Sequence, residues 1–185
     1  MEQQVGFRDI SWEQYEALAN KRGSTPRPRM HFLDGALELM ATSEEHEYLK
    51  ATLARCVETW AMLTGVVVHR AGSYTLKNKR KRAAAEADES YTVGTRHQPP
   101  DLVIEVMLSH GTIDKLEIYR RLGVREVWFW EDDALTVHCD DGSRWAERRT
   151  SGVLPDLDLA LIERCVRTGD QAKALKLLTS ALKRH

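Results

Sequence analysis

The sequence predicts an α+β fold (α/β/α-like) in which helices flank a mixed central sheet, with an N-terminal hairpin and C-terminal helices. Three observations predict this arrangement. Residues 99–130 follow a strand, helix, strand pattern, which indicates a βαβ unit with a parallel pair of strands. Residues 30–40 hold a DG turn between two short apolar runs, a strong hairpin signal. Residues 158–166 and 171–182 have the apolar spacing of two amphipathic helices.

The N-terminal half is predicted to contain two capped helices and further strands. Ser11 opens a capping-box pattern that begins a short helix. A second capping box at 42–45 begins the longest helix, which Gly65 ends. A strand follows at 66–70, and we expect the same sheet to continue over 73–76.

A run of basic residues follows these strands. Five of the six residues at 77–82 are basic: Lys77, Lys79, Arg80, Lys81 and Arg82. Because the run has no helical or strand periodicity, one interpretation is a solvated loop. The other is an arm that contacts the phosphates of a nucleic acid. Both interpretations stay open at this point.

The central strand is the most informative part of the sequence. Two prolines end the preceding segment, and residues 101–107 then form a short β-branched strand. Side chains alternate across a strand, so Leu102, Ile104 and Val106 share a core face. Glu105 points to the opposite side. A buried carboxylate is costly unless it is paired, and a divalent cation is one partner that takes carboxylate oxygens.

A crossover helix and a second strand follow. The helix is predicted over 112–122, with Thr112 as its N-cap. Lys115 lies one residue off the apolar stripe of this helix, from where it can point back at the strand that carries Glu105. The second strand ends in three aromatic residues at 128–130, which belong either to the core or to a homodimer interface.

Composition and charge restrict the class of protein. The formal net charge is −1, so any contact with a nucleic acid requires a local basic patch. The three cysteines, Cys56, Cys139 and Cys165, have neither the spacing of a zinc site nor that of a disulfide framework. No signal pattern and no apolar run long enough for a membrane span are present. The sequence therefore predicts a single cytoplasmic domain, 1–185, with no membrane partner.

Charged residues from separate segments are expected to meet at the central strand. Asp88 begins a strand that a short loop connects to the central one, so we expect Asp88 and Glu105 to be neighbours in the sheet. Glu45 and His46 occupy the N-terminal turn of the long helix, where anions are favoured. Carboxylates that hold Mg²⁺, together with the Lys115 amine to stabilise negative charge, could hydrolyse a phosphodiester.

Each of these residues also has a structural interpretation. Glu105 could pair with an arginine, and Asp88 could be a loop acid. Lys115 could be solvated on its helix, and His46 could be a histidine at the edge of the core. The residues alone are compatible with both a catalytic and a structural role.

The order of these features resembles the Uma-two family of restriction-endonuclease-like proteins, a branch of the PD-(D/E)XK nuclease superfamily. The similarity covers nearly the whole chain, and the GVREVWFW block is its most specific part. The matching segments are MHFLDGALELMATSEEHEYLK, AEADESYTVG, PPDLVIEV, DKLEIYRRLGVREVWFWEDDALTVH and VLPDLDLALIE. The resemblance implies a restriction-endonuclease-like fold with a mixed central sheet, helices on both sides and a divalent-metal site.

The resemblance also implies roles for individual residues. Asp88 matches the acid of the PD element and Glu105 that of the (D/E)XK element, so both would be metal ligands. Glu45 and His46 match a helical acid–histidine motif of the family. Ala87 stands where a proline would precede the aspartate, which costs turn rigidity rather than a ligand.

The second departure from the family pattern concerns the lysine. Met107 replaces the lysine two residues after Glu105, and it cannot stabilise charge. Lys115 on the following helix would supply that charge.

Together these features predict a nuclease that depends on Mg²⁺ (or Mn²⁺), acts on DNA and uses the basic run as a backbone contact. The predicted catalytic residues are Lys115, Asp88, Glu105, Glu45 and His46. The alternative is a catalytically inactive protein that keeps the fold as a nucleic-acid-binding or protein-interaction module.

Overall fold

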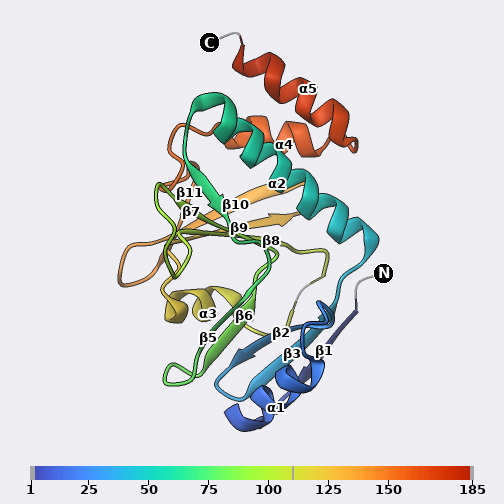
Figure 1. Ribbon diagram of the computed structural model, residues 1–185, viewed down its shortest axis with the longest axis vertical. Helices are drawn as coiled ribbons and strands as arrows, with labels where there is room; N and C mark the ends of the chain where they lie inside the picture. Colours follow the sequence, from blue (N-terminus) through green and yellow to red (C-terminus); the bar gives the residue numbers. More distant parts are fainter. Residues whose placement is uncertain (1–2, 110, 184–185) are drawn as a thin grey trace.

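The computed structural model describes residues 3–109 and 111–183 and has a mixed α+β fold (Figure 1). Its strands form two sheets, and helices lie on both sides of the larger one. The helices are α1 (Trp12–Arg22), α2 (Glu44–Thr64), α3 (Lys115–Leu122), α4 (Leu159–Val166) and α5 (Gln171–Leu182). The predicted fold class is confirmed.

The larger sheet has six strands in the order β11-β10-β9-β8-β7-β4. β8 runs parallel to β9, while every other neighbouring pair is antiparallel, so the sheet is mixed as predicted. The parallel pair is joined through α3, because parallel strands need a crossover connection. The strands are β4 (Val68–Arg70), β7 (Glu89–Val93), β8 (Leu102–Val106), β9 (Glu126–Glu131), β10 (Ala134–Asp140) and β11 (Trp145–Arg148).

The smaller sheet has five antiparallel strands in the order β1-β3-β2-β6-β5. Its β2–β3 hairpin is the predicted one, and Asp34 and Gly35 both adopt the positive φ that a tight two-residue hairpin turn needs. The strands are β1 (Gln3–Phe7), β2 (Arg29–Leu33), β3 (Ala36–Ala41), β5 (Thr75–Asn78) and β6 (Ala83–Glu86).

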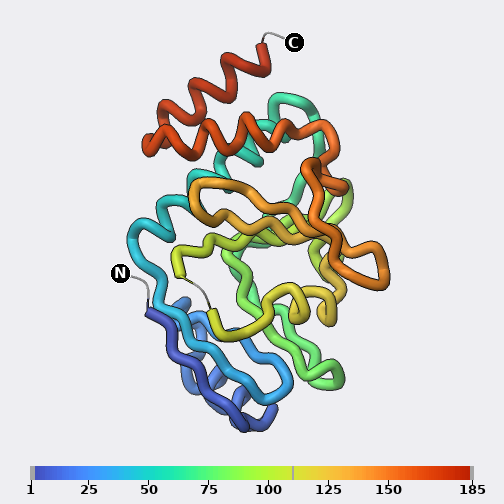
Figure 2. The backbone as a smooth tube through the Cα atoms, turned by 180° about the vertical axis from the view of Figure 1, so that it is seen from behind, coloured from blue at the N-terminus to red at the C-terminus, as the bar shows by residue number. Residues whose placement is uncertain are grey.

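The main hydrophobic core lies on one face of the larger sheet. Leu102, Ile104 and Val106 of β8 pack there with buried residues of α2, α4 and α5, as their alternation predicts. Figure 2 shows the same arrangement from behind, with these three helices on one side of the larger sheet and the smaller sheet on the other. The second face of β8 is therefore turned toward α3 and the smaller sheet.

Three local predictions are wrong. The segment 73–76 does not continue the sheet of β4, because β5 begins at Thr75 and belongs to the smaller sheet. No strand was expected at β6, whose residues are mostly alanine. The helix α3 begins at Lys115 rather than near Thr112, because the Asp114 side chain caps it by accepting from the backbone N of Glu117 at 2.9 Å.

The aromatic strand β9 belongs to the core. Trp128 is 0% exposed and Trp130 is 2% exposed, so neither offers a surface for a second copy of the chain. This result favours the core interpretation of these residues over the homodimer interface. Among the helices of the described residues, none combines the length and apolarity needed to cross a membrane.

Candidate functional site

A layer of buried charged side chains lies where the smaller sheet meets β7 and β8. The alternation of β2 explains its position. Met30 and Phe32 pack on the aromatic residues of α1, so Arg29 and His31 point to the opposite side, toward the larger sheet. The sequence predicted Asp88 and Glu105 of this layer but not the contribution of β2.

Glu105 and Lys115 form the centre of the layer. The Lys115 Nζ donates to Glu105 Oε2 at 2.6 Å, and Tyr119 donates to the other carboxylate oxygen. Lys115 is 4% exposed, because it lies on the buried face of α3 with Ile118 and Tyr119. The amine also lies 3.7 Å from Sδ of Met107, so the helix brings it to the side chain that replaces the strand lysine.

Glu105 is ionised although it is fully buried. Burial raises the pKa of its carboxyl, but the charge of Lys115, the nearby His31 and the hydrogen bonds from Lys115 and Tyr119 lower it below its usual value. Burial and the Glu105 charge raise the pKa of Tyr119 well above its ordinary range. Tyr119 therefore keeps its proton and donates a hydrogen bond to the carboxylate.

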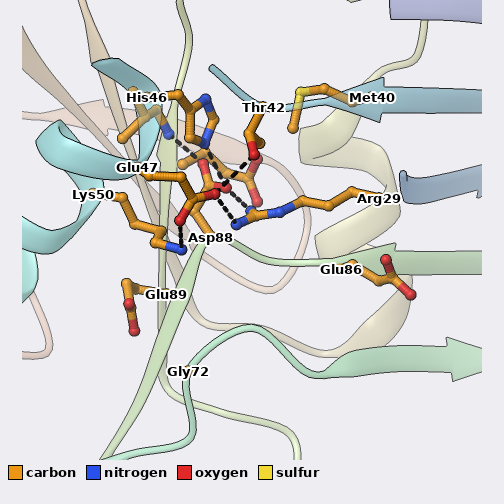
Figure 3. Close-up of polar contacts among 12 residues, drawn as sticks. Arg29, Met40, Thr42, His46, Glu47, Lys50, Gly72, Glu86, Asp88 and Glu89 are labelled. Carbon is orange, nitrogen blue, oxygen red and sulfur yellow. Dashed lines mark hydrogen bonds and ion pairs between the residues drawn. The ribbon is translucent and has the colours of Figure 1, made fainter. Parts of the chain in front are cut away.

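Asp88 is adjacent to Glu105 in the sheet. It directly precedes β7, where Glu89 pairs with Ile104, so the register places Asp88 beside Glu105. Its Oδ2 accepts from the backbone N of Val106 at 2.7 Å. Its Oδ1 lies 2.8 Å from His46 Nε2 and forms an ion pair with Arg29 (Figure 3). Asp88 and His46 are both 0% exposed.

Glu47, rather than Glu45, is the glutamate of α2 that joins this layer. Glu45 is exposed. Glu47 accepts from Thr42 Oγ1 at 2.8 Å, pairs with Lys50 and lies 3.5 Å from a guanidinium nitrogen of Arg29 (Figure 3). Partial burial raises the pKa of Glu47, but the hydrogen bonds from Lys50 and Thr42 outweigh it and lower the pKa to about 2.

The basic run covers the end of β5 and the β5–β6 turn, and most of its side chains are paired. Lys77 Nζ is 3.0 Å from Glu16, and Lys79 Nζ is 3.0 Å from Glu13, both on α1. Arg82 Nε is 3.5 Å from Asp34. Arg80 and Lys81 complete the turn, and Arg80 is exposed.

Asp101, directly before β8, is held by contacts within the protein. Its Oδ2 accepts from the backbone N of Val93, and its Oδ1 accepts from Arg125, each at 2.9 Å. His97 Nε2 lies 3.0 Å from the same carboxylate. These contacts tie the starts of β8 and β9 to the end of β7.

The donor chemistry of Asp88 and Glu105 fits a divalent cation. Mg²⁺ is typically bound through one or two carboxylates, with water and substrate phosphates as further ligands. Each of the four carboxylate oxygens already accepts a hydrogen bond from the protein. A carboxylate oxygen has a second lone pair, which can still bind a cation. Within residues 3–109 and 111–183, no three His, Cys, Asp or Glu side chains form a metal-binding group.

Comparisons with known proteins identify relatives. The family model of Uma2, described as "Putative restriction endonuclease", matches residues 12–174. A solved structure described as "a putative nuclease belonging to DUF820 from Anabaena variabilis" is similar with a TM-score of 0.50 and 10% sequence identity. The match covers 91% of this chain and 99% of that chain. At this identity the likeness shows a shared fold. No curated protein matches.

Proposed function

The chain belongs to the Uma2 family of restriction-endonuclease-like proteins, and on that premise we propose that it is a metal-dependent nuclease that hydrolyses phosphodiester bonds of DNA. In this proposal Asp88 and Glu105 bind Mg²⁺ or Mn²⁺, and Lys115 stabilises negative charge. His46 holds Asp88 in position, as outer hydrogen-bond partners of metal ligands do.

One observation carries the proposal: the Lys115 amine reaches Glu105. Met107 removes the lysine from the strand, so the site depends on whether another amine takes its place. Lys115 Nζ lies 2.6 Å from Glu105 Oε2 and 3.7 Å from Met107 Sδ. A helix residue therefore places an ammonium group beside the acid that the family pattern pairs with a lysine.

The residues of the layer divide the work of hydrolysis among them. A bound cation would polarise the phosphoryl oxygen and acidify water. Lys115 would stabilise the negative charge that grows on the phosphoryl group, in surroundings where charges are poorly screened. Arg29 and His46 fix the direction of the Asp88 carboxylate. Tyr119 does the same for Glu105.

The DNA contact and the location of the protein are parts of the same proposal. The basic turn is a candidate backbone contact, although ion pairs with α1 and Asp34 reduce the free charge of Lys77, Lys79 and Arg82. Such a contact would weaken with salt and carry little sequence information. The three cysteines are free, which supports a reducing compartment such as the cytoplasm.

Burial of the site favours a second function, that of a catalytically silent binding module. Asp88 and Glu105 are 0% exposed, and Lys115 is 4% exposed. A phosphodiester can touch these groups only after neighbouring side chains move. A chain in which they do not move would keep the fold and bind a nucleic acid or a protein without cutting it.

Metal binding is the first test. Titration calorimetry with Mg²⁺ and Mn²⁺ should show a site in the wild type that Glu105→Ala loses. Asp101→Asn, which changes an acid directly before β8 without touching the layer, is the matched control and should bind like the wild type. Equal binding by wild type and Glu105→Ala would refute the ligand assignment.

Cleavage is the second test. Lys115→Ala should lose DNA cleavage by about 10²-fold or more while it still binds the metal, because one charge-stabilising group is worth that much in a dry site. Lys176→Ala removes an exposed lysine of α5 and should cleave like the wild type. If the wild type cleaves no nucleic acid with either metal, the binding module is the better description.

A further inference from the structure

A second pair of buried polar side chains lies in the same layer. His31 on β2 and Glu38 on β3 are direct cross-strand partners and are 0% and 1% exposed. The distance from His31 Nδ1 to Glu38 Oε1 is 3.8 Å, which exceeds hydrogen-bond length. In the described part of the chain, neither ring nitrogen of His31 nor Oε1 of Glu38 makes a hydrogen bond of good geometry, although the backbone of Glu86 lies near the ring. Three unpaired polar atoms thus meet at one buried place.

Glu126 shows how this fold treats a buried carboxylate with a structural role. It is also 1% exposed, but it accepts hydrogen bonds from Trp128 Nε1, Ser151 Oγ and the backbone N of Gly152 and Val153. A buried polar group without a partner destabilises a fold, and a native one calls for an explanation such as a functional role or a bound water. The contrast with Glu126 indicates that His31 and Glu38 have a binding role rather than a structural one.

Glu38 is held in place through its other oxygen. Thr112 donates to Oε2 from its backbone N at 2.7 Å and from Oγ1 at 3.3 Å. A Cβ at Gly111 would lie 2.7 Å from this oxygen, so glycine allows the loop to approach the carboxylate closely. The loop fixes the carboxylate and leaves Oε1 for His31.

His31 is a neutral imidazole beside the Glu105–Lys115 pair. Burial and the charge of Lys115 lower the pKa of His31 to about 3. The ring therefore has one N–H donor and one nitrogen lone pair at neutral pH. His31 also interacts electrostatically with Glu105 and with Lys115, the acid and the amine of the proposed site.

We propose that His31 and Glu38 form a water-orienting dyad of the nuclease site. Glu38 Oε1 accepts a hydrogen bond from Nδ1–H of His31, and His31 Nε2 accepts one from the attacking water. The dyad rests on the proposed function, since the water attacks only if a phosphodiester is hydrolysed there. Catalytic hydrogen bonds are often long before substrate binds and shorten in the complex, which accounts for the present gap. Glu38 is then a positioning residue that acts through His31.

The other polar groups of the layer are already engaged. His46 Nε2 faces Asp88, Lys115 and Tyr119 donate to Glu105, and Arg29 pairs with Asp88. Glu45, a predicted catalytic residue, is exposed. His31 is the neutral acceptor of the layer that has a free nitrogen within the described residues.

The test compares two substitutions that each keep part of the imidazole. Glutamine can place a polar atom near the position of Nε2, whereas asparagine can place one only near Nδ1. With Mg²⁺ and a duplex DNA oligonucleotide, His31→Gln should keep kcat within about tenfold of wild type. His31→Asn should lose about 10²-fold or more in kcat at unchanged KM. His69→Gln on the edge strand β4 is the matched control and should cleave like the wild type.

Leucine tests whether shape alone matters at this position. His31→Leu has a similar volume but lacks the Nδ1–H that Glu38 accepts, so it should lose cleavage as His31→Asn does. Equal losses of kcat in His31→Asn and His31→Gln would overturn the dyad.

A measurement without DNA tests the pairing itself. Nitrogen-15 NMR of the imidazole should show the Nδ1–H tautomer of His31 in the wild type and its loss in Glu38→Gln. An Nε2–H tautomer in the wild type would overturn the dyad even if DNA is cleaved. If the tautomer is Nδ1–H but the wild type cleaves no DNA or RNA with Mg²⁺ or Mn²⁺, the nuclease and the water-orienting role fail together, and only the pairing survives.

Discussion

The two faces of the five-residue strand β8 have different surroundings, one apolar and one charged. Leu102, Ile104 and Val106 pack into the hydrophobic core with α2, α4 and α5. Glu105, one step along the strand, lies at 0% exposure among charged groups from α3 and the smaller sheet. The apolar face gains free energy from burial, whereas the polar face holds charges that are tolerated only in pairs. Stability and chemistry are thus separated across the thickness of one strand.

The largest expected effect comes from breaking the pair on the polar face. Glu105→Ala leaves Lys115 buried without its carboxylate, so the free energy of unfolding should fall by about 3–5 kcal/mol. Urea denaturation measures the loss. The double variant Glu105→Leu/Lys115→Met should recover most of this stability, because it removes both charges, but it should bind no metal. A double variant that is less stable than Glu105→Ala would contradict this account of the polar face.

The second largest effect is expected from low pH, which should lower the free energy of unfolding through His31 on the polar face. The pKa of His31 is lowered from 6.5 to about 3 in the folded chain. Between these two values the unfolded chain binds a proton at His31 and the folded chain does not, so the free energy of unfolding falls as the pH falls. The loss approaches about 4 kcal/mol at pH 3. Denaturation of wild type and His31→Leu at pH 7, 5 and 4 should show a flatter pH dependence in the variant. Parallel curves would refute the contribution of His31.

A smaller effect is expected on the apolar face. Ile104→Val removes one methylene from a residue that is 1% exposed, which should cost about 1 kcal/mol of unfolding free energy. Metal affinity should stay at the wild-type value, because the change faces away from the charged layer. Calorimetry that shows weaker Mg²⁺ binding would mean that the two faces are coupled rather than separate.

The smallest effect is expected outside both faces, on the basic turn. Lys79→Ala removes an exposed ion pair with Glu13 and should leave the melting temperature unchanged. If the turn contacts DNA, the salt dependence of binding should become shallower by about one ion. A salt dependence identical to that of the wild type would remove Lys79 from the DNA contact.

The sequence was most informative where local pattern and fold agree. The β-branched run of β8, the glycine after α3 and the DG turn of the β2–β3 hairpin each have a local cause, and the elements lie where these signals place them. β6 could not be found in this way, since alanine has low strand propensity. Its strand conformation comes from pairing with β2 and β5. Asp114 with Glu117 carried a capping signal that would have placed the start of α3 correctly.

The site was harder to predict, because its members meet only through tertiary structure. The structure does bring Asp88, Glu105, Lys115 and His46 into one layer. Arg29 and Glu47 gave no local signal. Each joins the layer through an ion pair with a residue that is distant in the chain. The catalytic roles of these four residues stay predictions.

The placement of the Lys115 amine on α3 has an evolutionary consequence. A lysine on the strand itself would have its separation from Glu105 set by the pleat of the backbone. Because the amine is carried by a helix, its separation from Glu105 depends on how Ile118 and Tyr119 pack that helix against the sheet. Drift in this apolar contact can therefore retune the spacing of acid and amine while both charged residues stay unchanged.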